Sequence, residues 1–170
     1  HDVAQQCEST DGVVYVPALL GLGTPDWDYG ARGTLLGLTR GAGRPQIVRA
    51  VLEGVAHNLR WLLDVYAKAG HPCPVLRSIG GGSRSDLWLQ IVADVTGRRV
   101  DAVVRPQDAG AVGAALTVAV GLGDLPDYAA IKALRATDRT FIPDPSTAAV
   151  HERQHQAFRC AYPGLSRVGR

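Results

Sequence analysis

The chain has 170 residues, of which 46% are hydrophobic and 20% are charged, a composition that suits one globular domain with a buried core. The net charge is only +2, and the basic side chains are scattered, which argues against a nucleic-acid-binding protein. The longest uncharged apolar stretch, residues 109–123, is too short and too rich in glycine and alanine to span a bilayer.

The N-terminus and the cysteines indicate a cytoplasmic protein. Residues 1–10 are polar and acidic, unlike a signal peptide. Cys7, Cys73 and Cys160 are far apart and form no Cys-x-x-Cys pair, which favours reduced thiols. The chain begins at His1 and contains no methionine, so we expect it to be part of a longer protein.

Two short strands and a glycine-rich loop are predicted first. Residues 13–20 are rich in β-forming side chains, and Pro17 limits them to a sheet edge, a bulge or a strand end. Residues 33–38 resume as a strand. The loop between them, residues 21–32, carries Trp27 and two aspartates. It is either functional or pinned over the core by its indole, and we favour pinning because a loop tryptophan usually gains burial.

The clearest helix begins at Pro45 and ends before Gly70, in the usual order of proline at the first turn and glycine past the last. We expect most of its regularly spaced apolar side chains to face a core: Val48, Val51, Leu52, Val55, Leu59, Leu62, Leu63 and Tyr66. The polar residues Glu53, His57, Asn58 and Arg60 fall on other faces. We expect His57 to be solvated or structurally hydrogen-bonded rather than catalytic.

A strand, a glycine turn and a helix then follow one another. Residues 75–79 indicate a short buried strand, three glycines at 80–82 break it, and Ser85 can cap the next helix. Glycines let backbone N–H groups approach a ligand that a Cβ would block, and the helix N-terminus carries partial positive charge. This geometry suits a nucleotide, although three glycines can equally serve only a tight turn.

The rest of the chain continues the alternation of helices and strands. Gly97 is expected to end the helix, residues 98–104 to form a strand, and Asp108 to start a helix of small residues. This order predicts an α/β domain whose sheet is partly parallel, with ligands beyond the carboxyl ends of the strands. A short helix is expected within residues 125–135, and Ser146 is expected to cap a last polar helix through Ala161.

In this arrangement, the Pro45 and Ser85 helices pack against a mixed sheet and the Ser146 helix docks on the outside. The side chains expected to be buried are Val51, Leu52, Val55, Leu59, Ile79, Leu87, Ile91 and Val103.

Residues 151–155 match the zinc motif His-Glu-x-x-His. A zinc hydrolase needs a third protein ligand, and the sequence after His155 offers no His, Asp or Glu, only Cys160. We therefore expect no stoichiometric metal on this helix. A solvated helix should instead dock through three apolar side chains: Val150, Phe158 and Tyr162.

Taken together, several motifs resemble the C-terminal half of the FGGY carbohydrate kinases. Residues 21–41 resemble that half of the family. Its second signature is matched at every fixed position by Gly33, Leu35, Gly37 and Leu38, followed by residues 46–47 and 50–53. Residues 80–90 are similar to its adenosine-binding turn, in the form usual for xylulokinases. The small-residue helix from Asp108 resembles its final helix, although a glutamate is commoner at 108 and alanine, serine or threonine at Gly110. Residues 141–145 and 162–163 also resemble its tail.

The resemblance implies an α/β fold of the actin-like ATPase (ribonuclease H-like) kind, a mixed sheet flanked by helices. Residues 1–170 would form the C-terminal domain of a sugar kinase, a fragment without its N-terminal domain. In the whole enzyme, ATP with Mg²⁺ would donate its γ-phosphoryl group to a sugar or polyol hydroxyl in the cleft between two similar domains. The general-base aspartate would lie upstream, so no catalytic residue and no metal ligand is expected in this chain.

The resemblance assigns the nucleotide contacts to the glycine turn, and the cofactor-binding residues it implies are Gly80, Gly81, Gly82, Ser83 and Ser85. Arg84 is equally suited to a phosphate contact and to a surface salt bridge. The implied partners are ATP, the sugar or polyol and the N-terminal kinase domain, with no nucleic acid and no membrane. A homodimer is left open.

The sequence leaves two questions open: which acceptor is phosphorylated, and whether the domain belongs to an enzyme at all. Residues 21–25 are nearer to glycerol kinases, whereas the glycine turn is nearer to xylulokinases. We favour a pentulose such as xylulose, with glycerol or another polyol second. The competing class is a nucleotide-sensing or structural domain without chemistry, because a fold alone does not determine function.

Overall fold

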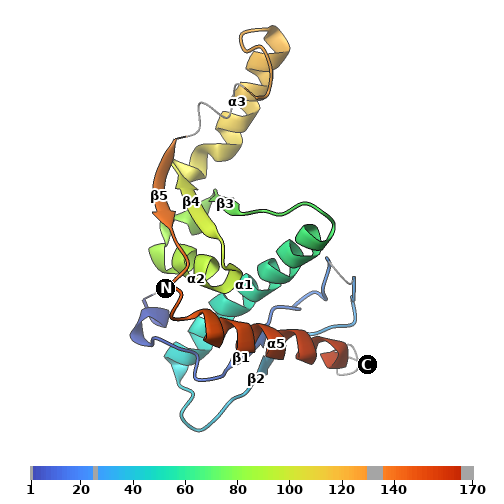
Figure 1. Cartoon of the computed structure of the whole chain (residues 1–170), viewed down its shortest axis with the longest axis vertical. Coiled ribbons are helices and arrows are strands. Elements are labelled where there is room, and N and C mark those ends of the chain that lie inside the picture. Colours follow the sequence, from blue (N-terminus) through green and yellow to red (C-terminus); the bar gives the residue numbers. More distant parts are fainter. Residues whose placement is uncertain (1, 25–26, 130–135, 166–170) are drawn as a thin grey trace.

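A computed structural model describes residues 2–24, 27–129 and 136–165 (Figure 1). Its helices and strands are β1 (Val14–Val16), β2 (Thr34–Leu36), α1 (Arg44–Lys68), β3 (Val75–Ser78), α2 (Asp86–Thr96), β4 (Arg99–Val103), α3 (Ala109–Leu122), β5 (Thr137–Phe141) and α5 (Ala148–Leu165). Three short 3₁₀ helices complete the described elements: η1 (Ala4–Gln6), η2 (Gly81–Arg84) and η3 (Pro106–Asp108).

The described strands form two sheets rather than the single sheet that we expected. β1 and β2 form an antiparallel pair, and β3, β4 and β5 form a second sheet in that order. In the second sheet β3 and β4 are parallel, whereas β4 and β5 are antiparallel, so the predicted mixed α/β fold is confirmed. α1 contacts β1, α2 and α5 and thereby joins the two sheets (Figure 1).

Local sequence explains where the helices begin and end. Pro45 lies in the first turn of α1, where the Gln46 side-chain oxygen accepts a hydrogen bond from the Gly43 N–H at 3.1 Å. In α2, the Ser85 Oγ accepts from the Trp88 N–H at 3.2 Å, and Gly97 ends the helix with a φ of +65°. These predicted helix ends are confirmed.

The last helix differs from its prediction at both ends. α5 begins at Ala148, because the Asp144 carboxylate and carbonyl first accept bonds from the Ser146 N–H and the Thr147 hydroxyl in a turn. It continues to Leu165, past the predicted end at Ala161. The short helix expected within residues 125–135 falls largely outside the described residues.

The prediction of which face of α1 is buried was only partly correct: Leu63 is buried as expected, and Val48, Leu52, Leu59 and Leu62 are half-buried. Val51, Val55 and Tyr66 are exposed, whereas the polar Glu53 and His57 are buried. The cause is the close approach of α1 to β1, since a Cβ at position 54 would lie 2.1 Å from the Tyr15 carbonyl oxygen. The helix therefore packs through a face of small residues, and its large aliphatic side chains are turned partly away. The buried residues of α1 are Ala50, Glu53, Gly54, Ala56, His57, Trp61 and Leu63.

Two buried clusters form the core. The first lies between β1, α1 and α5 and contains Val14, Val16, Ala18, Leu22, Ala31, Trp61, Phe158, Tyr162 and Leu165. The second lies between α2 and β4, with one residue of α1, and contains Ala56, Leu89, Ile91, Val92, Ala93, Val95, Val100 and Ala102.

Other core predictions were only partly correct. Ile91 is buried as expected, but Ile79 is 61% exposed, because β3 is an edge strand that pairs only with β4 among the described strands. The rest of the expected core is half-buried: Leu52, Leu59, Leu87 and Val103.

The interpretation that Trp27 pins the loop of residues 21–32 over the core was wrong. Trp27 is 63% exposed, and Leu22 and Ala31 hold the loop to the core instead.

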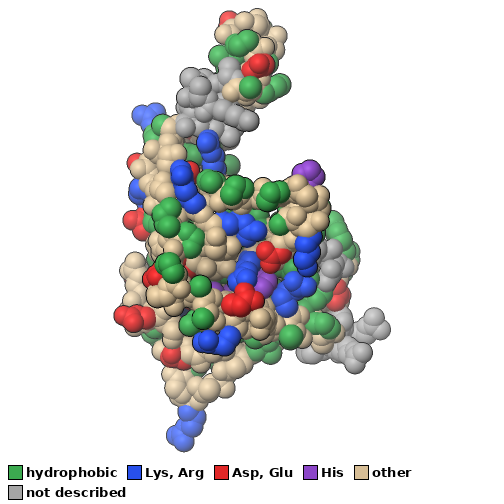
Figure 2. Space-filling view, viewed as in Figure 1, with side chains coloured by type: hydrophobic (Ala, Val, Ile, Leu, Met, Phe, Trp, Pro, Cys, Tyr) green, Lys and Arg blue, Asp and Glu red, His purple; other side chains and the backbone are tan. Residues whose placement is uncertain are grey.

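The histidines between α1 and α5 are buried, which also contradicts the prediction of a solvated last helix. His151 and His155 are each only 5% exposed, while Val150, expected to dock the helix, is exposed. Phe158 and Tyr162 do dock it, as predicted. The His57 ring centroid lies 6.2 Å from that of His151 and 5.5 Å from that of His155. On the face of the molecule that Figure 2 draws, arginine and acidic side chains gather over α1.

α3 extends away from the rest of the molecule, and none of its residues is buried (Figure 1). Within the described residues, no helix combines the length and the apolar character that crossing a membrane requires.

We predict that Gly54→Ala lowers the free energy of unfolding by at least about 1–3 kcal/mol, because its Cβ would overlap the Tyr15 carbonyl oxygen and push α1 off β1. Urea denaturation measures the change. Gly113→Ala is the matched control, since no atom lies within 4 Å of the added Cβ and alanine favours a helix. Equal stability of Gly54→Ala and the unmodified chain would contradict the close approach.

We also predict that acid destabilises the metal-free chain. Burial, followed by the charges of neighbouring histidines, lowers the pKa of His57 from 6.5 to about 3, and burial and then Arg60 lower that of His155 to about 4. Because the unfolded chain binds these protons near pH 6.5 and the folded chain does not, this stability is present above about pH 6.5 and is lost as the pH falls toward the folded values.

The expected loss between about pH 7 and about pH 5 is roughly 2 kcal/mol for each histidine. Chemical denaturation at the two pH values, with a chelator present, measures it. His57→Phe should make the stability less dependent on pH. Equal stability of the unmodified chain at both pH values would show that the two rings take up protons as readily in the folded chain as in the unfolded chain.

Candidate functional site

The glycine turn joins β3 to α2 through a backbone that requires glycine at its first position. Gly80 has a φ of +81°, in the left-handed region that other residues rarely adopt. Its N–H donates to the Pro106 carbonyl at 2.7 Å, so the turn is attached to η3, where α3 begins. The structure therefore brings together two of the predicted motifs, the glycine turn and the small-residue helix.

Gly81 is the open position of the turn. An added Cβ at Gly81 would meet no atom within 4 Å, whereas one at Gly82 would contact the Trp88 indole at 3.4 Å. Gly81 lines a hollow of about 550 Å³. The other residues that line this hollow are Asp2, Gln5, Arg84, Ser85 and Asp86. A ligand can thus approach the backbone at Gly81 without obstruction, whereas the exposed Gly82 has the Trp88 indole on the side where a Cβ would lie.

The two serines of the turn have mainly structural partners. Ser83 is fully buried, and its Oγ lies 2.7 Å from the Ser78 Oγ. Ser85 lies at the edge of the hollow, and its Oγ caps α2 through the Trp88 N–H. Of the predicted nucleotide-binding residues, Gly81 and Ser85 therefore line the hollow. Gly80, Gly82 and Ser83 shape the turn behind it.

Arg139 of β5 is a part of the site that the sequence did not reveal. Its guanidinium donates to the Ser83 carbonyl at 2.8 Å and pairs with Asp86 in the first turn of α2. These partners lie 56 and 53 residues away in sequence, so no local motif signals the contact. Arg139 holds the turn against the sheet.

The charges around the hollow are mixed. The Asp86 carboxylate partly offsets the positive end of α2, so this terminus is less favourable for a phosphate than the sequence implied. Arg84 is exposed, and the described part of the chain gives it no ion-pair partner. The hollow therefore offers carboxylate acceptors for hydroxyl groups and one guanidinium for an anion.

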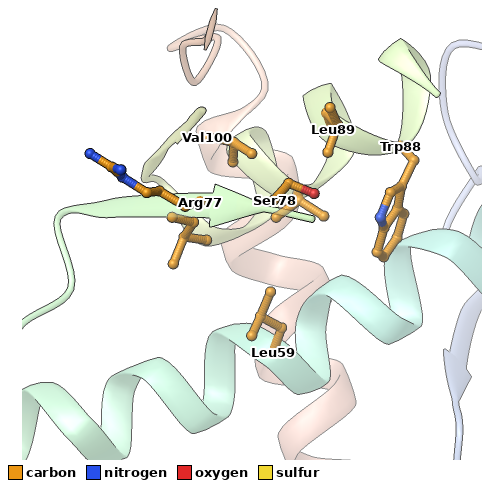
Figure 3. A pocket seen from close by; sticks show the side chains of 8 residues that line it. Leu59, Arg77, Ser78, Trp88, Leu89 and Val100 are labelled. Atoms are coloured by element: carbon orange, nitrogen blue, oxygen red, sulfur yellow. The ribbon is translucent and has the colours of Figure 1, made fainter. Parts of the chain in front are cut away.

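A second, apolar cavity lies behind the turn, between β3, α2 and α1 (Figure 3). Its volume is about 240 Å³, below the usual size of a ligand pocket. Leu59, Leu89 and Val100 converge on it, whereas the Arg77 side chain points away. We interpret this cavity as a packing gap beneath the turn rather than as a second binding site.

Comparison with known proteins gives consistent matches. Residues 2–122 match the family described as "FGGY family of carbohydrate kinases, C-terminal domain". A glycerol kinase of Gloeobacter violaceus is 47% identical over 142 residues, which cover 82% of this chain and 28% of the relative. The chain thus spans only about 28% of the length of that curated relative.

Solved structures show the same fold. The xylulose kinase of Rhodospirillum rubrum is 34% identical with a TM-score of 0.82, and the match covers 98% of this chain and 33% of that one. The glycerol kinase of Plasmodium falciparum, solved with ADP, is 27% identical with a TM-score of 0.79. That match covers 95% of this chain and 33% of that structure.

Proposed function

Because the chain belongs to the FGGY family of carbohydrate kinases, in the part that corresponds to the C-terminal domain, we propose that it supplies the nucleotide-binding half of an ATP-dependent kinase for a sugar or polyol. The observation that carries this proposal is the open backbone at Gly81 beside the start of α2. The similar glycerol kinase of Plasmodium falciparum was solved with ADP, which supports the choice of nucleotide.

The proposed role of each residue follows from its position. The backbone at Gly81 lies against the adenosine, the carboxylates of Asp2 and Asp86 accept hydrogen bonds from the ribose hydroxyls, and Arg84 contacts a phosphate oxygen. Gly80, Gly82 and Ser83 keep the turn in shape, and Ser85 orients α2. Phosphoryl transfer depends chiefly on positioning and charge, which are the contributions such a turn can make.

The same hollow is poorly suited to Mg²⁺, which prefers several oxygen ligands. Of its two carboxylates, Asp86 is already paired with Arg139. The residues that line the hollow therefore fit the nucleoside better than the metal. We propose that the Mg²⁺ ligands, the general base and most sugar contacts belong to sequence outside this chain, in an N-terminal kinase domain.

For the acceptor, we propose glycerol ahead of xylulose, which reverses the order expected from the sequence. The support for this order is that the curated relative from Gloeobacter violaceus, at 47% identity, is a glycerol kinase. Among the solved structures the order is the opposite, with the xylulose kinase 34% identical and the glycerol kinase 27% identical. The xylulokinase-like form of the glycine turn is compatible with this order, because that turn contacts the nucleotide in the proposal and not the acceptor. Assays of the whole kinase with both acceptors would decide between them.

In the full-length kinase, we predict that Gly81→Val raises the KM for ATP by at least about tenfold while changing the KM for the acceptor much less. The added carbons would occupy the open face that we assign to the nucleotide. Steady-state kinetics with each substrate varied in turn measures both constants. Gly113→Ala, on the exposed α3, should change neither; an unaltered KM for ATP in Gly81→Val would make the turn merely structural.

The isolated 170-residue chain should phosphorylate no sugar and bind ATP only at millimolar concentration or more weakly. In our proposal the contacts that enclose the triphosphate lie outside this chain, and even three missing charge-assisted hydrogen bonds at about 1.5–3 kcal/mol each shift a micromolar site into that range. Calorimetric titration with ATP measures this affinity. Micromolar binding would mean that the phosphate contacts lie within this chain.

A further inference from the structure

Three metal-ligating side chains converge in the interior, apart from the glycine turn. Glu53 and His57 lie one helical turn apart on α1, and His151 faces them from α5. One ligand atom from each lies within 4.8 Å of the others, and the residues are 3%, 1% and 5% exposed, respectively. Carboxylate oxygen and imidazole nitrogen are both common zinc ligands.

His57 gives an independent reason to expect a ligand here. Neither of its ring nitrogens has a hydrogen-bond partner among the described residues, although the side chain is almost completely buried. A buried polar group without a partner loses its hydration and gains nothing in return. A metal ion bound to one of these nitrogens would restore a partner to it.

The residues behind the cluster orient its other two ligands. Gln154 donates to the Thr10 hydroxyl at 2.7 Å, so its amide oxygen accepts from His151 Nδ1 at 3.1 Å. This bond places the lone pair of His151 on Nε2. Arg49 donates to one oxygen of Glu53 at 2.8 Å and thereby holds the carboxylate in place. Such supporting bonds are typical around zinc ligands.

We propose that Glu53, His57 and His151 bind one zinc ion that links α5 to α1. Ligand atoms around a tetrahedral zinc lie about 3.3 Å apart, so the side chains need to move only a little closer, with water as the fourth ligand. The sequence predicted no metal because no third ligand follows His155 on the last helix. The structure instead supplies two ligands from α1.

This site differs from the His-Glu-x-x-His zinc motif that the sequence suggested. It uses His151 but not His155, whose Nε2 lies 3.7 Å from Asp64. Glu152, the general base in such motifs, is exposed and paired with Arg60. The geometry therefore supports a structural zinc that joins two helices, and no hydrolytic reaction.

The direct test uses the whole chain, stripped with a chelator and then titrated with zinc sulfate by calorimetry. We expect one equivalent to bind with submicromolar affinity and the melting temperature to rise. Substitution with Co²⁺ should give the visible spectrum of a tetrahedral site with nitrogen and oxygen ligands. Failure to bind one equivalent of zinc would overturn the proposal, and so would a cobalt-thiolate band, which would move the metal to a cysteine.

Variants then identify the ligands. His57→Gln should weaken zinc binding more than about 100-fold, and Gln154→Leu, behind His151, about 10- to 100-fold. His155→Gln is the matched control: it is equally buried on α5 and should leave the affinity nearly unchanged. His57→Cys should restore binding, which guards against a loss caused by misfolding alone. Equal losses in His57→Gln and His155→Gln would overturn the assignment.

Discussion

The close contact between α1 and β1 at Gly54 is the constraint on which the other packing depends. It determines the rotation of α1 about its own axis, because only a residue without a Cβ fits against the Tyr15 carbonyl. That rotation places Trp61 in the first core cluster and Ala56 in the second. It also turns Glu53 and His57 inward, toward α5, so the same contact that joins the sheets brings polar groups into the interior.

Local patterns in the sequence predicted the ends of α1 and α2, the glycine turn and the mixed α/β fold, because each depends on residues close together in the chain. They predicted the buried face of α1 only in part, since Leu63 is buried but Glu53 and His57 are buried as well. Hydrophobic periodicity weights large side chains, whereas tight helix packing selected Ala50 and Gly54. The fold class was thus predictable from short-range features, while the orientation of its main helix required three-dimensional contacts.

The candidate site divides in the same way. Gly81 and Ser85 could be found from the motif, since glycine spacing and a helix cap are local signals. Arg139 could not, because its contacts with Ser83 and Asp86 depend on how β5 pairs with β4. His151 was noticed as part of a motif, but with the wrong neighbours, since its partners on α1 lie far away along the chain.

The exposed α3 means that unfolding of this chain need not be a single cooperative event. Its 14 residues include three glycines and bury no side chain in the described structure. An isolated helix of this length is only marginally stable in water. Because no side chain of α3 packs into either core cluster, the helix gains little stability from α1 and the two sheets, and it melts independently of them. The helical signal from circular dichroism includes α3, whereas the fluorescence comes from three tryptophans, none of which lies on α3, so the two signals will report different transitions.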